Sequence, residues 1–189
     1  WVIDPNPSDW VRAQGLNLNT SLPAEPAVVL VAVKPQMMGD ALPSLKALGG
    51  GRTVFLSVAA GTPIAAFEEA LGSATPIVRA MPNTPAAIGQ GITALIGNRA
   101  ASTDDVDLAD SLMSAVGQTV RLDSEDQMDA VTGVSGSGPA YVFHMIECMT
   151  AAGVKQGLPE KLAARLALVT VAGAGQLALH SDDNPAQLR

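Results

Sequence analysis

The sequence is poor in cysteine and in charge, and each shortage excludes a class of protein. A single cysteine among 189 residues rules out an internal disulfide, so the chain is not a small secreted domain held together by such bonds. Charged residues make up 15% of the sequence and the net charge is −7. This composition argues against a nucleic-acid or anionic-membrane surface, but it leaves room for a local basic pocket that holds a phosphorylated cofactor. The 48% of apolar residues suffices for a globular core.

The first residues, WVIDPNP, contain neither the charged nor the apolar region of a signal peptide. Nothing at this end contradicts a cytoplasmic enzyme. An apolar strand begins at once, with Trp1 where an initiator methionine would stand. We therefore expect the sequence to be a fragment.

Apolar runs alternate with helical patterns through the first two thirds of the chain. AVVLVAV is the clearest strand, because an unbroken β-rich run of this kind is typical of a strand buried on both faces of a parallel sheet. The alternation predicts an α/β fold with a Rossmann-like, doubly wound parallel sheet. The expected strands cover residues 1–4, 27–33, 53–58, 76–80, 91–96 and 119–122, the last at an edge, and the expected helices 12–14, 35–48, 63–71 and 103–116.

From Asp123 onward the pattern is helical, over residues 124–130, 141–152 and 159–180. The last helix carries no charge between Arg165 and Gln176, and a helix that is apolar all round must be buried on all sides. Arg165 and Gln176 are polar interruptions that argue against a membrane span. We therefore expect a second subunit to cover this helix. The sequence thus predicts a dinucleotide-binding domain at 1–122 and a helical domain for substrate and dimerisation at 123–189.

A narrow polar stripe marks the expected helix 141–152. His144, Glu147 and Thr150 recur every three residues on it, and we expect a structural role for the histidine. Cys148 lies among apolar neighbours, which favours a buried structural thiol over a reactive one.

The segment AVTGVSGSGPAY, residues 130–141, predicts a compact turn that opens a long helix. Ser135 to Gly138 are small, and Pro139 stands where the first helical turn tolerates a missing donor. Free backbone N–H groups and the positive end of the helix dipole would favour a carboxylate or phosphate there. An ordinary capped helix end explains the spacing equally well.

Polar residues also follow the expected strands at their carboxyl ends, where open α/β sheets bind ligands. Lys34 could meet a cofactor phosphate, or it could simply be solvated. Asn83 and Thr84 are held between two prolines, Pro82 and Pro85, which suits either a binding lip or a tight crossover.

Residues after the first expected strand bear on the choice of dinucleotide. Asp4 would suit the 2′-hydroxyl of NADH, whereas Asn6 and Ser8 could serve the 2′-phosphate of NADPH. Plain turn chemistry is the alternative for all three, and the choice of cofactor stays open.

Four stretches of the sequence resemble motifs of the pyrroline-5-carboxylate reductases. They are AVKP at 32–35, AAG at 59–61, VRAMPNTP at 78–85 and DAVTGVSGSGPAY at 129–141. The resemblance implies an oxidoreductase that passes hydride from NADPH or NADH to the C=N bond of 1-pyrroline-5-carboxylate and gives proline, the last step of proline biosynthesis. It also implies a homodimer or larger ring, with an N-terminal Rossmann half and an interlocking helical half.

The resemblance further implies site residues. Glu125 would meet the ring nitrogen of the substrate, where a carboxylate favours the protonated, more electrophilic form. The alternative for Glu125 is an acid at the start of its own helix. Ser137 and Gly138 would lie near nicotinamide and substrate. The implied cofactor contacts are Asn19 on the adenosine side, Ala32, Val33, Lys34 and Pro35 beside the pyrophosphate and ribose, and Ala60 near the nicotinamide.

Two family segments are absent from these 189 residues: the first strand with its glycine-rich phosphate loop, expected before Trp1, and a Ser-Pro-Gly-Gly-Thr segment, expected after Arg189. The resemblance therefore implies that the 189 residues alone are inactive. Two other interpretations stay open, namely another NAD(P)-dependent imine or keto reductase of the same layout and a non-catalytic dimeric dinucleotide-binding remnant.

Overall fold

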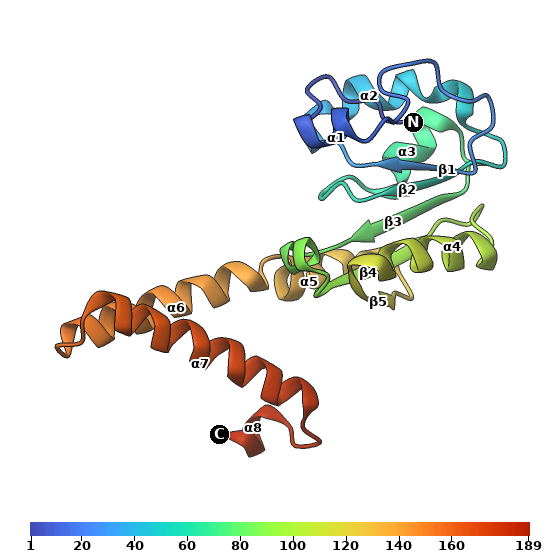
Figure 1. Cartoon of the computed structure of the whole chain (residues 1–189). Helices are drawn as coiled ribbons and strands as arrows, with labels where there is room; N and C mark the ends of the chain where they lie inside the picture. The colour runs from blue at the N-terminus through green and yellow to red at the C-terminus, as the bar shows by residue number, and fades with distance from the viewer.

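The apolar runs form five strands of one sheet, and a long helical hairpin projects from that sheet in the computed structural model, which describes all residues from Trp1 to Arg189 (Figure 1). Along the sheet the strands follow their order in the sequence. They are β1 (Val28–Val31), β2 (Val54–Ser57), β3 (Ile77–Met81), β4 (Gly91–Gly97) and β5 (Gly117–Arg121).

The sheet is mixed, so the prediction of a wholly parallel sheet is wrong at one place. β1, β2 and β3 are parallel, and β4 is parallel to β5, but β4 runs antiparallel to β3. Only the short turn η3 (Thr84–Ile88) separates β3 from β4. A parallel connection needs a crossover of a dozen residues or more, which this link does not provide.

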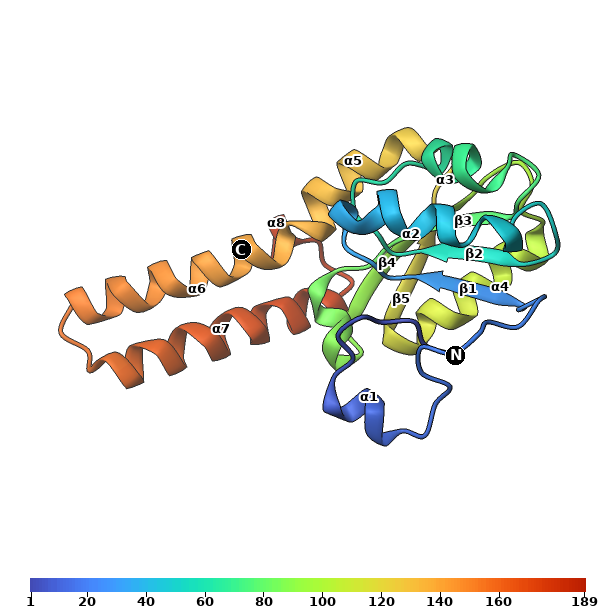
Figure 2. The same ribbon diagram turned by 90° about the horizontal axis from the view of Figure 1, so that it is seen from above.

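Helices cover both faces of the sheet, as a doubly wound fold requires (Figures 1 and 2). Phe55 and Ile77 belong to the core under α2 and α3, whereas Leu56 and Val78 belong to the core under α4. Successive strand residues point to opposite faces, so two apolar cores share one sheet. The helices are α2 (Met38–Ser44), α3 (Ile64–Leu71) and α4 (Thr103–Met113), with short helical turns at η1 (Pro35–Met37), η2 (Lys46–Leu48) and η4 (Ser114–Val116).

The N-terminal segment departs from the prediction of a buried strand. Val2 makes a single bridge with Leu18, and the side chains of Trp1 and Ile3 are exposed. No strand of the sheet lies beside this segment, so its apolar residues have no face to cover. The first helix, α1 (Asp9–Ala13), begins earlier than expected because Ser8 caps it.

The helical part begins with one continuous rod, which corrects the prediction of a separate glycine turn. Residues 132–136 form a π-helical segment, and the Ser137 N–H donates to the Thr132 carbonyl at 2.8 Å. The Ser137 amide is therefore already satisfied within the rod. The elements are η5 (Glu125–Gln127), α5 (Met128–Val131), η6 (Thr132–Gly136), α6 (Gly138–Lys155), α7 (Glu160–His180) and α8 (Pro185–Leu188).

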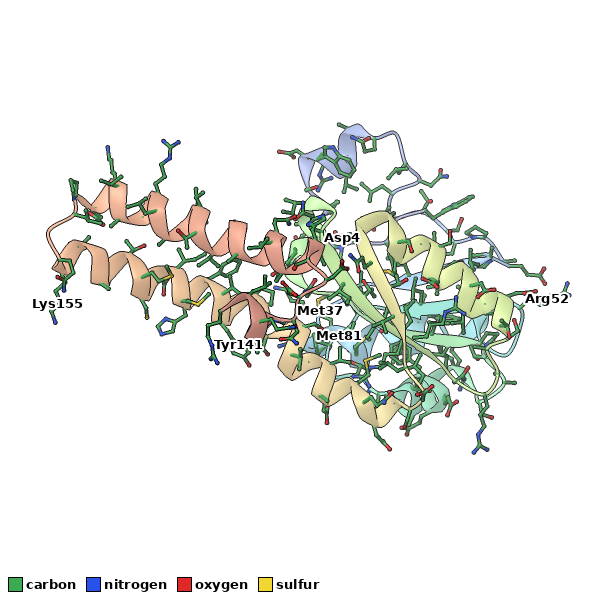
Figure 3. The ribbon with its side chains drawn as sticks, turned by 90° about the horizontal axis from the view of Figure 1, so that it is seen from below. Asp4, Met37, Arg52, Met81, Tyr141 and Lys155 are labelled. Atoms are coloured by element: carbon green, nitrogen blue, oxygen red, sulfur yellow. The ribbon has the colours of Figure 1, made fainter.

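The α6–α7 hairpin is largely uncovered. It extends from Tyr141 near the sheet to Lys155 at its tip (Figure 3). The two helices pack closely where Gly153 faces Ala163, since a Cβ at Gly153 would lie 3.1 Å from that side chain. Cys148, expected to be buried, is exposed, because α6 has a neighbour only on the side of α7. By length and composition α7 could also cross a membrane, and 11% of its most apolar window is buried.

A polar clamp ties α4 to the edge strand β5. The Asp110 carboxylate accepts hydrogen bonds from the Thr119 hydroxyl and, at 2.6 Å, from the Arg121 guanidinium, which also pairs with Asp107 at 2.7 Å. The Thr119 hydrogen bond and then Arg121 hold the pKa of Asp110 below its ordinary value of 3.8. The clamp therefore stabilises the charged form of Asp110.

We expect Asp110→Asn to lower the urea midpoint of unfolding at neutral pH. Because the pKa of Asp110 is lower in the folded chain than in the unfolded chain, its contribution is fully present above 3.8 and is lost as the pH falls through the lowered pKa. The difference from wild type should therefore shrink in acid. Asp182→Asn, whose carboxylate pairs with no cation, is the control. Equal midpoints for Asp110→Asn and wild type at pH 7 would contradict this role.

Candidate functional site

The carboxyl ends of the three parallel strands create the site. Val31 pairs with Ser57, and Ser57 pairs with Arg79, so the loops after β1, β2 and β3 leave the sheet side by side. These loops carry three of the four motifs singled out in the sequence. Open α/β sheets bind ligands at this edge.

Most of the predicted cofactor contacts in these loops are accessible. Ala32, Lys34, Pro35 and Ala60 are exposed, and Val33 is half-buried. The Lys34 ammonium makes no ion pair within the chain, so its charge is free to meet an anion.

Glu125 lies at the joint between the sheet and the helical rod. Its Oε1 accepts a hydrogen bond from the Ile64 N–H at 2.9 Å and forms an ion pair with Arg79 Nη1 at 2.6 Å. Ile64 is the first residue of α3, and Pro63 before it offers no side-chain cap. The carboxylate of Glu125 thus caps α3 from 61 residues away. Glu125 also lies in the first turn of its own short helix, which Ser124 caps, so the alternative of an acid at a helix start stays open beside this contact.

Arg79 is the site residue that the sequence reasoning did not assign. It lies in the buried strand β3, and its side chain is 10% exposed against 30% for Glu125. The segment PIVRA, residues 76–80, does indicate that Arg79 has a partner, because a charge inside an otherwise apolar strand requires one. Spacing alone does not identify that partner, since it lies 46 residues away.

Asn83 joins the proline-flanked loop to the rod. Its Nδ2 donates to the Ser135 carbonyl at 3.2 Å, and its Oδ1 accepts from the Ile92 N–H at 2.9 Å. Beside it, Met81 packs on Gly136, where a Cβ would lie 3.1 Å from the methionine methyl. The loop after β3 and the glycine-rich segment are therefore in contact. Ser137 and Gly138, both half-buried, follow directly.

Three other predicted residues are not brought to this edge by any hydrogen bond. Asn19 binds the backbone of Asp4 twice, through Oδ1 at 2.9 Å and Nδ2 at 2.8 Å. Ser8 caps α1, and the Asn6 N–H donates to the Asp4 carboxylate at 2.8 Å. The contacts of Ser8 and Asn6 are those of ordinary turns, the alternative that the sequence left open for them, whereas Asn19 joins two segments that are 15 residues apart.

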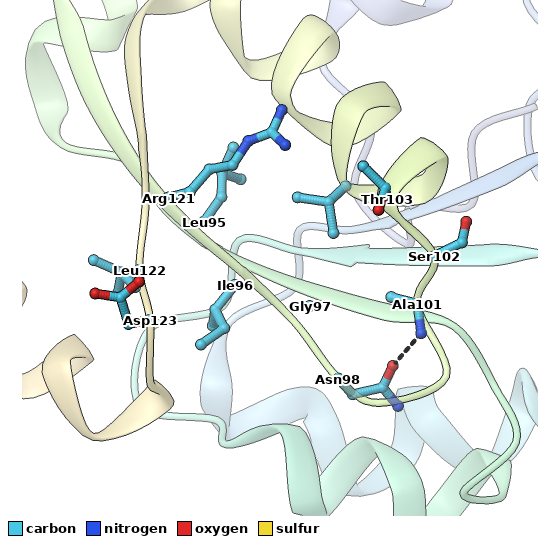
Figure 4. A pocket seen from close by; sticks show the side chains of 11 residues that line it. Leu95, Ile96, Gly97, Asn98, Ala101, Ser102, Thr103, Arg121, Leu122 and Asp123 are labelled. Carbon is cyan, nitrogen blue, oxygen red and sulfur yellow. Dashed lines mark hydrogen bonds between the residues drawn. The ribbon is translucent and has the colours of Figure 1, made fainter.

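One hollow lies at another part of the sheet. It has a volume of about 310 Å³ between β4, β5 and α4, and it includes Asn98, Ser102 and Arg121 (Figure 4). None of the predicted site residues lines it. The Asn98 side chain there accepts from the Ala101 N–H at 3.0 Å and shapes the turn into α4.

Comparisons with known proteins all find relatives of one family. A family model described as pyrroline-5-carboxylate reductase dimerisation matches residues 125–189. The pyrroline-5-carboxylate reductase of Pseudomonas aeruginosa is 46% identical over 171 residues, which are 90% of this chain and 63% of that protein. The one from Methanosarcina acetivorans is 36% identical over 191 residues, covering 100% of this chain and 70% of that protein.

Solved structures agree. The Plasmodium falciparum pyrroline carboxylate reductase with NADP bound has a TM-score of 0.85 at 31% identity, over 98% of this chain and 70% of that one. The reductase from Coxiella burnetii has a TM-score of 0.82 at 38% identity, over 88% of this chain and 62% of that one. The chain spans 63% and 60% of the length of the Pseudomonas and Synechocystis relatives.

A double-mutant cycle tests the Glu125–Arg79 joint. Arg79→Met leaves the carboxylate unpaired, and Glu125→Gln leaves the guanidinium unpaired in a largely buried strand. We expect each single change to lower the free energy of unfolding by about 1–3 kcal/mol. The double variant should lose less than the sum of the two, because each change removes the same interaction. Strictly additive losses would show that the pair is not coupled.

Proposed function

Because the chain belongs to the pyrroline-5-carboxylate reductase family, we propose that it forms the core of an oxidoreductase that reduces 1-pyrroline-5-carboxylate to proline. Residues 1–122 belong to the dinucleotide-binding domain and contact part of NADPH or NADH, and residues 123–189 bind substrate and a second copy. The observation that carries this proposal is the contact of the helical rod, through Glu125, with the carboxyl edge of the sheet.

The residues at that edge fit part of a dinucleotide. Lys34 supplies a free positive charge for a phosphate, and the short side chains of Ala32 and Ala60 let a ligand approach the backbone. None of the five strands is followed by a glycine-rich phosphate loop, so the main cradle for the pyrophosphate is not among these residues. When bound, the nicotinamide supplies the hydride.

Glu125 has one oxygen left for the substrate. Oε1 serves Arg79 and Ile64, whereas Oε2 has no partner within the chain. A carboxylate beside the ring nitrogen favours the protonated imine, whose carbon accepts hydride more readily. In this proposal Arg79 and the α3 amide position the carboxylate, Asn83 sets the rod against the sheet, and Ser137 and Gly138 border the substrate.

The partner that we propose is a second copy of the chain. The chain exposes 12156 Å², whereas a folded monomer of its mass exposes about 8,500 Å². The excess of about 3,700 Å² on one chain is more than the roughly 1,000–2,500 Å² that each partner buries in a typical obligate interface, so the chain exposes enough surface for such an interface. Much of it lies on the hairpin, where Phe143 is 59% and Val169 61% exposed. The dimerisation model matches this same region.

We place the protein in the cytoplasm. The exposed free thiol of Cys148 suits a compartment that keeps thiols reduced.

The assembly can be tested with a charge on α7. Val169→Asp puts a carboxylate into the proposed interface, where it has no partner, and this costs several kcal/mol. We expect light scattering to show monomer or aggregate for this variant. Gln156→Asp adds the same charge at the exposed turn of the hairpin and should keep the dimer mass. A Val169→Asp variant of unchanged dimer mass would refute the interface.

The activity can be tested with a chimera in which the flanking segments of the Pseudomonas aeruginosa reductase complete the chain at both ends. We expect the chimera to oxidise NADPH or NADH in the presence of 1-pyrroline-5-carboxylate, and the 189 residues alone to show no appreciable rate, since they lack a phosphate loop. A folded, dimeric chimera without activity would favour a non-catalytic dinucleotide-binding protein. Activity only on other imines or on ketones would favour a different reductase.

A further inference from the structure

Asp4 is an acid that the proposed reaction does not use, and its backbone is fixed in place. The Val2 N–H donates to the Asn17 carbonyl at 2.9 Å, and the Asn19 N–H donates to the Val2 carbonyl at 2.8 Å, so two segments run parallel here. The Asn19 side chain binds Asp4 twice, accepting from its N–H at 2.9 Å and donating to its carbonyl at 2.8 Å. Asn19 is also the one residue other than glycine with a positive φ, 54°. The chain thus adopts a less favourable backbone conformation at the residue that holds Asp4.

Asp4 lies at the end of the sheet where the parallel strands finish. Figure 3 shows it toward the same end as Met37, which follows β1, and Met81, which ends β3. Arg52, which precedes β2, lies at the opposite end. Dinucleotides bind across the carboxyl ends of the strands in open α/β sheets. In these folds an acidic side chain accepts a hydrogen bond from the 2′-hydroxyl of the adenosine ribose in NADH, whereas an arginine accommodates the 2′-phosphate of NADPH.

One oxygen of the Asp4 carboxylate is available to a ligand. Oδ1 accepts a hydrogen bond from the Asn6 N–H at 2.8 Å, whereas Oδ2 has no partner within the chain. The side chain is half-buried and forms no ion pair. An ionised carboxylate accepts hydrogen bonds and donates none, so Oδ2 suits a hydroxyl group and repels a phosphate.

The segment around Asp4 offers little to a 2′-phosphate. A phosphate monoester carries about −1.5 to −2 charges at pH 7. Residues 1–26 contain three acids and a single cation, Arg12. The Nε of Arg12 donates to the Pro7 carbonyl at 3.2 Å, and the Ser8 hydroxyl accepts from the Val11 N–H as the cap of α1. The charge of this segment therefore favours a dinucleotide without the phosphate.

We propose that Asp4 makes the protein select NADH over NADPH, a proposal that rests on the proposed function. Oδ2 accepts a hydrogen bond from the 2′-hydroxyl of the adenosine ribose, and Asn19 is the residue that positions the carboxylate. The 2′-phosphate of NADPH meets the same carboxylate as a like charge, which weakens its binding.

Isothermal titration calorimetry of NADH and of NADPH, on the chimera completed by the Pseudomonas aeruginosa segments, tests this selection without any catalytic step. We expect NADH to bind at least about tenfold more tightly than NADPH, since a hydrogen bond to a charged group is gained in one case and a like charge is met in the other.

Asp4→Asn removes the charge but keeps an oxygen that accepts from the Asn6 N–H, so the turn is preserved. We expect this variant to bind NADH several-fold more weakly and NADPH about tenfold more tightly, because the like charge is gone. Asp9→Asn is the matched control, since it removes the same charge from the exposed first turn of α1. It should bind NADH as the unmodified chimera does.

Asn19→Gly tests the positioning role, because glycine keeps the left-handed backbone without strain but releases Asp4. NADH should bind several-fold more weakly, with little change for NADPH. Circular dichroism checks that each variant is folded.

The outcomes separate this proposal from the proposed function. A chimera that binds NADPH as tightly as NADH, or an Asp4→Asn variant with an unchanged ratio of the two affinities, overturns the selection by Asp4 and leaves the reductase intact. Equal losses of NADH affinity in Asp4→Asn and Asp9→Asn would also overturn it, since general charge would then explain both. A folded chimera that binds neither dinucleotide overturns the proposed function and the selection together.

Discussion

The carboxylate of Glu125 determines how the helical rod sits on the sheet. A guanidinium within a buried strand is costly unless it is paired, and a helix without a side-chain cap leaves its first amides unsatisfied. Arg79 in β3 and Ile64 at the start of α3 present these two requirements close together, and one oxygen of Glu125 meets both. The rod therefore has one favourable position relative to the sheet, and that position places its glycine-rich segment at the carboxyl edge of the sheet.

A second link fixes the rotation of the rod. Asn83 bonds the Ser135 carbonyl and the Ile92 amide at once, while Met81 packs on Gly136, where a Cβ would lie 3.1 Å from the methionine methyl. Beyond this point α6 leaves the sheet, and the apolar surface of the hairpin has no cover within the chain. The same rod thus serves the proposed site at its base and the proposed dimer interface along its length.

Local pattern predicted the strands, the long helices and the two-sided sheet, because burial on a sheet face and helical periodicity are local properties of the sequence. What it missed depends on contacts between distant residues. The direction of β4 follows from a short link, and residues 1–4 form no strand because no neighbouring strand lies beside them. Cys148 is exposed because α6 has only one neighbour. A charged Arg79 within an apolar strand predicts that it has an anionic partner, but only the fold shows that this partner is Glu125.

Steady-state kinetics of Glu125→Gln in the active chimera test the central claim, that the carboxylate which joins rod and sheet also serves the substrate. We expect the specificity constant for 1-pyrroline-5-carboxylate to fall by roughly one to two decades, because a charge-assisted hydrogen bond worth about 1.5–3 kcal/mol is lost. The KM for the dinucleotide should hardly change. A lower melting temperature with normal kinetics for both substrates would contradict the claim and leave Glu125 a structural residue only.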